Sequence, residues 1–246
     1  MSEVTVIGGG IIGVCCALSL QRQGIGTTLI ERGDIGGEAT LGNCALMARS
    51  EIVPLSKPGV MKKLPGWILD SEGPLAVRPG HLPTAIPWLL KFLRNARADR
   101  VAQICHGLGE IAKLAQDDFD NVIEAANIKD IWAENEVLYL YDSKSQYDAD
   151  TFSWNLREAE GCFVTPLNKN ELRDLEPDVN TDGKFGVVAN GWKSFTNPQR
   201  LTKELANLFV SLGGQIIAQD VARIKMLNGR ADQVKFENGE ILKLDK

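Results

Sequence analysis

The sequence is poor in the residues that build metal centres and disulfide frameworks. Its 246 residues include two histidines, His81 and His106, and five cysteines with no C-x-x-C pair. An odd number of cysteines without paired spacing is typical of reduced thiols in a cytoplasmic compartment. Two widely spaced histidines give little support to a zinc site. We therefore expect no disulfides and no metal site, and we expect a cytoplasmic protein.

Long apolar runs and an excess of positive charge are also lacking. No apolar run reaches the length that a bilayer span requires, and no basic segment precedes the first apolar run, so we expect neither a membrane span nor a secretory signal. The net charge is −5, which argues against a general nucleic-acid-binding protein. The hydrophobic content of 44% and charged content of 24% are ordinary for a globular protein of one large or two modest domains.

Residues 4–31 form the most informative stretch. A β-prone run at 4–7 ends in the glycines at 8–10, an apolar helical pattern covers 11 to about 23, and a second β-prone run at 27–30 ends at Glu31. This strand–helix–strand unit has the size of a βαβ dinucleotide site. The surrounding pattern favours a dinucleotide site over an ordinary glycine-rich turn.

The glycine spacing has a chemical reason. Gly8, Gly10 and Gly13 fit G-x-G-x-x-G: Gly8 allows the tight turn, Gly10 lets a pyrophosphate approach the backbone, and Gly13 lets the helix pack against the strand. The helix N-terminus, at Ile11 and Ile12, offers N–H groups and partial positive charge to the phosphates. Glu31 can accept hydrogen bonds from ribose hydroxyls and would repel a 2′-phosphate, which disfavours NADP.

The loop at 32–45 departs from a plain NAD domain, in which another βα unit would follow soon. It is rich in glycine and small polar residues, including Thr40, Gly42 and Asn43. Such a loop suits a second contact with a long ligand. A surface loop capped by Thr40 is the alternative.

The middle of the chain predicts a separate domain. Repeated prolines in 51–83 exclude a long helix and predict an irregular connection. A helix should begin with Pro87 in its first turn and end near Arg97, and apolar residues at 101–126 recur at helical spacing, as in a core-facing amphipathic helix. The carboxylates at 117, 118 and 120 resemble a catalytic set but are more typical of a solvated face.

Residues 131–189 are rich in β signals, with strands at 137–141 and 184–189 and a short helix at 170–175. Asn197 should cap a helix with Pro198 at its first position, followed by a strand at 216–217. Two Asn-Gly pairs, at 228 and 238, predict a three-stranded meander over 221–244. We expect three segments: 1–50 in the nucleotide domain, 51–192 as an inserted domain, and 193–246 returning to the nucleotide domain.

The motifs together resemble the D-amino-acid oxidase superfamily of FAD-dependent oxidoreductases, and within it the bacterial D-amino-acid dehydrogenase-like enzymes. The resemblance covers nearly the whole chain. Its motifs are VIGGGIIG, Glu31-Arg32, ATLGNCA at 39–45, the proline-rich PGWILD, GPL and VRP at 65–79, PWL and FLR at 87–94, and LEP at 175–177.

The resemblance implies an α/β fold: a Rossmann-like FAD-binding domain with an inserted α+β substrate domain. Gly8, Gly10, Gly13, Ile11 and Ile12 would hold the pyrophosphate of FAD, Glu31 the ribose, and Arg32 the adenine end. Residues flanking the flavin path would be Thr40, Asn43 and Ala45, and Val221 would meet the adenine. Family members continue past position 246, so the chain is expected to lack a C-terminal part.

The implied activity is oxidative deamination of a small amino acid, with electrons passed to a quinone or another carrier. The resemblance leaves open a peripheral association with the inner face of the membrane and a partner subunit. The alternatives are a non-catalytic chain that binds a dinucleotide and needs a partner to complete the flavin site, and an NAD-dependent dehydrogenase. No catalytic residue is assigned; Trp192, Tyr139, Tyr141 and His81 fit core or surface roles better than substrate contacts.

Overall fold

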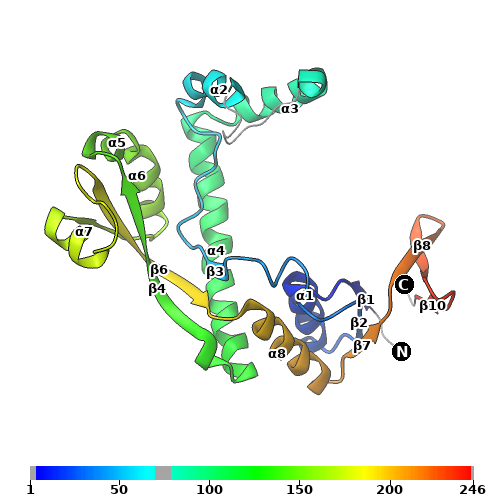
Figure 1. Cartoon of the computed structure of the whole chain (residues 1–246). Helices are drawn as coiled ribbons and strands as arrows, with labels where there is room; N and C mark the ends of the chain where they lie inside the picture. Colours follow the sequence, from blue (N-terminus) through cyan, green and yellow to red (C-terminus); the bar gives the residue numbers. More distant parts are fainter. Residues whose placement is uncertain (1–3, 70–78, 245–246) are drawn as a thin grey trace. The chain divides into compact units, whose positions relative to one another are not determined.

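The structure is a computed structural model that describes residues 4–69 and 79–244. The chain divides into two compact units. Figure 1 labels their helices and strands. The first comprises residues 1–46, 118–133 and 193–246, and the second comprises residues 47–117 and 134–192. Each unit is therefore assembled from segments that lie far apart in the sequence. The three-segment domain boundaries expected from the sequence stay a prediction.

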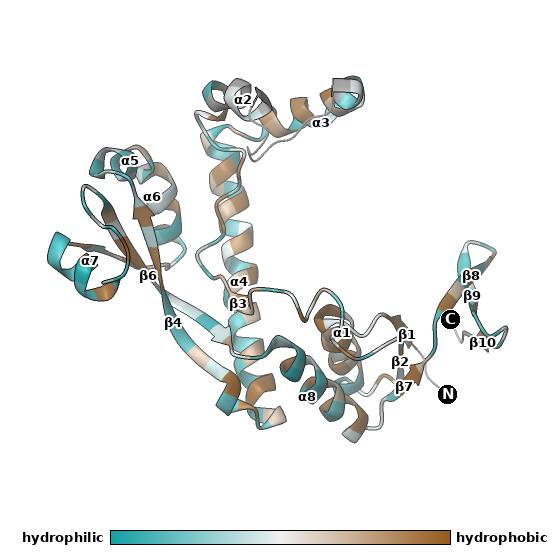
Figure 2. Cartoon of the chain, viewed as in Figure 1, coloured by the Kyte–Doolittle hydropathy of each residue, from teal (hydrophilic) through white to brown (hydrophobic). Residues whose placement is uncertain are grey.

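The first unit is built on a parallel sheet. Strands β1 (Val4–Ile7), β2 (Thr27–Glu31) and β7 (Gln215–Ala218) pair in the order β1-β2-β7. In the register, Leu29 of β2 lies between Val6 of β1 and Ile216 of β7. Because β2 is the central strand, its first four residues are all buried, as a strand covered on both faces should be. Figure 2 shows hydrophobic stretches of these strands in brown.

Two helices pack together in this unit. Helix α1 (Ile11–Arg22) buries Val14, Ala17 and Leu18, and helix α8 (Pro198–Ser211) contacts it. The Asn197 side chain accepts a hydrogen bond of 2.8 Å from the backbone N–H of Arg200, which confirms the predicted cap. The buried residues of α8 repeat at helical spacing and include Leu201, Leu205 and Phe209.

The predicted meander is confirmed. Strands β8 (Val221–Leu227), β9 (Arg230–Phe236) and β10 (Ile241–Lys243) form an antiparallel sheet in the order β10-β9-β8. Asn228 and Gly229 connect the first two strands, both with positive φ, as a type I′ hairpin turn requires. Val234 and Phe236 of β9 form one buried cluster with Ile30 of β2. The meander is thereby fixed beside the end of the central parallel strand.

A third sheet has many buried residues in its central strand. Strands β3 (Leu46–Met47), β6 (Phe185–Phe195) and β4 (Trp132–Tyr141) pair in that order, and β5 (Val164–Leu167) pairs antiparallel with β6. Val187 and Ala189 of β6 are fully buried. The boundary between the two compact units falls within β4 and β6.

Helices supply the rest of the second unit and part of the first. They are α2 (Val60–Leu69), α3 (Leu82–Arg94), α4 (Ala98–Ala126), α5 (Lys144–Ala149), α6 (Thr151–Ala159) and α7 (Lys169–Leu175), with short 3₁₀ turns η1 (Pro79–His81) and η2 (Lys129–Ile131). Helix α4 confirms the predicted long helix. Its stripe is buried at Val101, Cys105 and Ile123 but exposed at Ile111 and Leu114, so the prediction of a core-facing stripe holds only in part.

Three local predictions were wrong. Pro87 lies inside α3 and not in its first turn, because the helix begins five residues earlier with Pro83 in its first turn. Helix α2 occupies part of the proline-rich segment, where an irregular connection was expected, since its first five residues contain no proline; at ten residues it does not contradict the exclusion of a long helix. Helices α5 and α6 lie within residues 131–189, which were expected to be rich in β structure with one short helix at 170–175. Part of the proline-rich motif, at 70–78, lies outside the described residues.

Candidate functional site: a nucleotide pocket at the strand ends

The turn from β1 into α1 is as tight as the glycine spacing predicts. Gly8 has a φ of 108°, a backbone conformation that residues with a side chain rarely adopt. Its N–H donates a hydrogen bond of 2.8 Å to the carbonyl of Ile30. A Cβ added to Gly13 would lie 1.8 Å from the carbonyl oxygen of Gly8. Only glycine at position 13 therefore allows the helix to approach the turn this closely.

Gly9 and Glu31 form a contact that the glycine motif did not reveal. The Glu31 carboxylate accepts hydrogen bonds from the N–H groups of Gly9 at 2.5 Å and Gly33 at 2.9 Å. A Cβ on Gly9 would lie 2.9 Å from Cβ and Cγ of Glu31, so a side chain there would push the glutamate away. The end of β2 is thereby tied to the glycine turn.

The Glu31 carboxylate is held in its ionised form. Partial burial raises its pKa, but the backbone N–H groups of Gly33, Gly9 and Arg32 and the positive charge of Arg32 act in the opposite direction and leave the pKa below its ordinary value. An ionised carboxylate at the end of the second strand is a strong acceptor for ribose hydroxyls.

Thr40 closes the N-terminus of α1. Gly10, at the cap position, has no side chain to accept a hydrogen bond, and the buried Thr40 hydroxyl accepts one from the N–H of Ile11 at 3.0 Å. Thr40 therefore caps α1 and does not cap its own loop, as the alternative of a surface loop had it. No acidic residue lies in the first turn of α1. The positive end of the helix dipole is therefore not neutralised by its own side chains.

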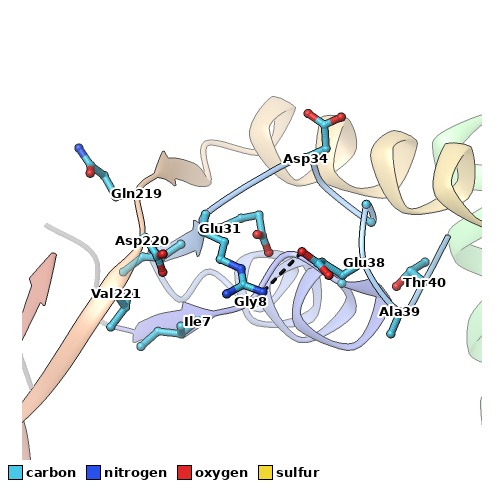
Figure 3. A pocket seen from close by; sticks show the side chains of 15 residues that line it. Ile7, Gly8, Glu31, Asp34, Glu38, Ala39, Thr40, Gln219, Asp220 and Val221 are labelled. Atoms are coloured by element: carbon cyan, nitrogen blue, oxygen red, sulfur yellow. Dashed lines mark hydrogen bonds and ion pairs between the residues drawn. The ribbon is translucent and has the colours of Figure 1, made fainter. Parts of the chain in front are cut away.

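These elements surround a pocket of about 400 Å³ (Figure 3). Figure 3 shows Glu38, Ala39 and Thr40 approaching it from the loop after β2, and Gln219, Asp220 and Val221 from the segment after β7. The lining residues are Ile7, Gly8, Gly10, Ile30, Glu31, Arg32, Asp34, Gly36, Gly37, Glu38, Ala39, Thr40, Gln219, Asp220 and Val221. All of them belong to the first compact unit.

Six residues expected to bind the cofactor line this pocket, and five do not. Those that line it are Gly8, Gly10, Glu31, Arg32, Thr40 and Val221. Ile11, Ile12, Gly13, Asn43 and Ala45 lie outside the lining, and Ile12 is 76% exposed. Among the lining residues that sequence reasoning missed, Gln219 and Asp220 carried no local signal, because they reach the pocket only through the pairing of β7 with β2.

The loop that ends at Ala45 has a defined conformation. The Asn43 side-chain oxygen accepts a hydrogen bond of 2.7 Å from the N–H of Ala45, which has a φ of 52°. The carbonyl of Ala45 in turn accepts a hydrogen bond of 2.9 Å from the N–H of Phe195. Asn43 therefore shapes its own loop, and the resulting turn is attached to the end of β6.

The charges around the pocket suit a dinucleotide that has no 2′-phosphate on its adenosine ribose. Arg32 contributes a positive charge and lies 3.5 Å from the Glu38 carboxylate. Glu31, Asp34 and Asp220 add further carboxylates to the lining. A 2′-phosphate beside this set would be repelled, whereas neutral ribose hydroxyls find acceptors. The glycine turn and the helix N-terminus fit a pyrophosphate, so the residues present match the adenosine diphosphate half of FAD.

A scan against family models decides the family. The model of the DAO family, described as FAD dependent oxidoreductase, matches residues 3–243. The chain belongs to this family of FAD-dependent oxidoreductases. FAD is therefore the cofactor, as expected, and the NAD-dependent alternative is set aside.

The sequence of this chain is similar to those of a D-amino-acid oxidase and a D-amino acid dehydrogenase. The chain is 32% identical over 242 residues to a D-amino-acid oxidase of Bradyrhizobium diazoefficiens, a match that covers 97% of this chain and 57% of the relative. It is 29% identical over 218 residues to a D-amino acid dehydrogenase of Helicobacter pylori, covering 87% of this chain and 51% of the relative. The chain thus spans about half the length of these curated relatives.

Solved structures show the same FAD-dependent oxidoreductase fold. L-proline dehydrogenase from P. horikoshii superposes with a TM-score of 0.64 at 17% identity, covering 99% of this chain and 51% of that one. L-amino acid deaminase from Proteus myxofaciens superposes with a TM-score of 0.65 at 15% identity, covering 99% of this chain and 44% of that one. At these identities the likeness shows the fold alone.

The aromatic residues considered for substrate contact have partners within the second unit. Trp192 is buried and donates a hydrogen bond of 2.8 Å to the Ser50 hydroxyl, and Trp154 donates one of 2.8 Å to the Tyr141 hydroxyl. Burial raises the pKa of Tyr139 and of Tyr141 to about 12, so both stay protonated. His81 is exposed.

Among the helices in residues 4–69 and 79–244, none has both the length and the apolar character of a membrane span.

Proposed function

We propose that this protein is an FAD-dependent enzyme that oxidatively deaminates a small amino acid, either a D-amino acid or a related amine. The observation that carries the proposal is the combination of the nucleotide pocket with a match to a D-amino-acid oxidase along 97% of this chain. When bound, FAD supplies a two-electron acceptor, so that the amine becomes an imine, which water hydrolyses to a keto acid and ammonia.

The residues of this chain would bind and orient the cofactor. The backbone around Gly8 and Gly10, with the N-terminus of α1 at Ile11 and Ile12, would hold the pyrophosphate, and Gly13 would keep that helix close. Glu31, with its lowered pKa, would accept hydrogen bonds from the ribose hydroxyls. This assignment is supported by the place of the ionised carboxylate, which accepts a hydrogen bond from the N–H of Gly9 in the glycine turn.

The remaining cofactor contacts are assigned by their place along the loop and the meander. Arg32 and Val221 line the same pocket as Glu31 and would contact the adenine end. Thr40, Asn43 and Ala45 lie on the loop that leads away from the helix N-terminus, and would flank the path toward the flavin ring. The turn that Asn43 stabilises gives this part of the loop a fixed backbone.

The electron acceptor in this proposal is a quinone or another carrier, not NAD. Its support is the likeness to a D-amino acid dehydrogenase of Helicobacter pylori. A quinone acceptor would bring the protein to the inner face of the cell membrane, as a peripheral protein. Sedimentation of the protein with membrane vesicles that contain a quinone, compared with vesicles without it, measures that association.

The experiment that tests the activity is spectroscopic. The protein is purified with FAD, its visible flavin absorbance is recorded, and D-alanine, D-proline, glycine or sarcosine is added without oxygen. Bleaching by at least one of these amines is expected, with release of ammonia from D-alanine or glycine, of methylamine from sarcosine, and formation of a cyclic imine from D-proline. A protein that cannot be reconstituted with FAD, or a flavin that none of the amines reduces, would contradict the proposal.

A second candidate is a non-catalytic chain that binds the dinucleotide and needs a partner to complete the flavin site. One observation favours it. Every residue that lines the pocket belongs to the first unit, where the adenosine diphosphate half of FAD would bind. Flavin fluorescence during titration with this 246-residue chain separates the candidates. Stoichiometric FAD binding with reduction by an amine argues against the need for a partner, whereas binding without reduction favours it.

A further inference from the structure

Helix α4 and the end of helix α6 bring three metal-ligating side chains together within the second unit. His106 and Glu110 are four positions apart on α4, so they lie on one face of the helix. The carboxylate of Glu160, the residue that follows the last residue of α6, accepts a hydrogen bond of 3.0 Å from Nδ1 of His106. One ligand atom from each of the three residues lies within 4.8 Å of the others.

A glycine in the middle of α4 makes room for this arrangement. A Cβ on Gly109 would lie 2.7 Å from Oε2 and 2.9 Å from Cγ of Glu160. Glycine inside a helix is less stable than alanine by about 1 kcal/mol. The missing side chain lets the Glu160 carboxylate lie directly against α4, where its side chain is only 11% exposed.

A cation already occupies the space between the two carboxylates. The ammonium group of Lys113 lies 2.9 Å from Glu110 Oε1 and 3.4 Å from Glu160 Oε2. Lys113 is 39% exposed, so its flexible side chain can turn into solvent. The two glutamates thus form a place where positive charge is stabilised, and the lysine would compete with an added metal ion.

We propose that His106, Glu110 and Glu160 form a binding site for a divalent transition-metal ion, with Zn²⁺ as the representative. One imidazole and two carboxylates are borderline-to-hard ligands, which suit Zn²⁺ or Mn²⁺ and leave further positions for water. Ligand atoms around Zn²⁺ lie about 3.3 Å apart, since each bond is about 2.0–2.2 Å long. The exposed side chains of His106 and Glu110 would turn toward Glu160 to close the 4.8 Å span.

This site departs from the expectation that the chain holds no metal. Histidine spacing in the sequence could not indicate it, because Glu160 lies 54 positions from His106. The site does not depend on the flavin chemistry proposed above, and its metal would connect α4 to the end of α6.

The test is calorimetric titration of the purified 246-residue chain, without added cofactor, with ZnCl₂. Saturable binding of one ion per chain is expected. Glu160→Gln and His106→Asn should each weaken binding by about tenfold or more. His81→Asn and Glu124→Gln, which change the same residue types outside the cluster, should bind as the wild type does. Lys113→Met should strengthen binding, because it removes the competing ammonium group.

Two further outcomes decide the assignment. Co²⁺ in place of Zn²⁺ should show no thiolate charge-transfer absorbance, whereas such a band would assign the ion to cysteines and overturn the site. Absence of saturable binding by the wild type, or His106→Asn that binds like the wild type, would also overturn it. If Glu160→Gln does not fold, as judged by far-ultraviolet circular dichroism, Lys113→Met still decides: unchanged or weaker binding refutes the proposal.

Discussion

Replacing Gly13 with alanine should reverse the usual effect of a glycine-to-alanine change in a helix. Alanine inside a helix is normally more stable than glycine by about 1 kcal/mol. At position 13 the new Cβ would lie 1.8 Å from the carbonyl oxygen of Gly8, which is backbone and cannot turn away. The helix must move away from the strand by more than an ångström, and overpacking of this kind costs about 1–3 kcal/mol or more.

Gly107 is the matched control for this change. It also lies inside a helix, α4, and a Cβ there would meet no atom within 4 Å. We therefore expect Gly107→Ala to increase the free energy of unfolding by about 0.5–1 kcal/mol. We expect Gly13→Ala to decrease the free energy of unfolding by about 1–2 kcal/mol once the helix propensity is counted.

The assay is urea denaturation followed by circular dichroism, with hydrogen exchange at the amides of β1 and α1. Exchange reports the local stability of the first unit even if the two units unfold separately. Gly13→Ala should also weaken FAD binding, whereas Gly107→Ala should leave it unchanged. If Gly13→Ala is as stable as wild type and keeps its exchange protection, close packing at Gly8 does not determine the geometry of this turn.

Three further predictions, with four substitutions, concern the first unit. Since the Glu31 pKa lies below its ordinary value of 4.5, the stabilisation from its carboxylate should be present above that pH and lost as the pH falls through the lower, folded-state pKa. The difference in the free energy of unfolding between wild type and Glu31→Gln, measured by urea denaturation across pH, should therefore shrink in acid. A difference that stays constant with pH would contradict this. Asp120→Ala should reduce the free energy of unfolding by about 2–3 kcal/mol, because the Lys193 ammonium, 2.7 Å from both carboxylate oxygens and only 9% exposed, would lose its carboxylate partner. Lys193→Met should reduce the free energy of unfolding less, and the opposite order would refute the argument. Asn197→Ala should cost about 1 kcal/mol in thermal or urea unfolding by removing the cap of α8, and no loss would show that the cap hydrogen bond is replaced.

The sequence was most informative where the signal is local. The glycine spacing at 8–13 predicted the first strand–helix–strand unit, because turn, helix start and close packing each require a residue type at a fixed distance. Asn197-Pro198 and Asn228-Gly229 likewise predicted a helix start and a hairpin turn from neighbouring residues. In each case the determining contacts lie within a few positions.

Other helix positions carried signals that competed with each other. Pro87 looked like a first-turn residue, but Pro83 occupies that place, and α3 tolerates a second proline in its interior. Helix α5 was missed, although Ser143 and Gln146 have the spacing of a capped helix and the Ser143 hydroxyl does accept from the Gln146 N–H at 3.3 Å. There the surrounding β-prone residues outweighed a real local signal.

Contacts between distant segments were not accessible from the sequence. The hydrogen bond from Gly9 to Glu31, the pocket residues Gln219 and Asp220, and the meeting of His106 with Glu160 all depend on how separate elements pack. Residue type and spacing carry no information on such pairs until the strand order is known. The glycine turn and the start of α1 could therefore be predicted better than the other residues that line the pocket.

The place of β7 beside β2 has a consequence for how the protein is made. During synthesis the first two strands emerge early, but their third strand and the pocket residues that follow it emerge only after residues 32–214. One edge of β2 must stay unpaired over that time, and closing so long a connection slows folding. We therefore expect cofactor binding to be a late event, and a ribosome-bound chain that ends before residue 215 should not retain FAD.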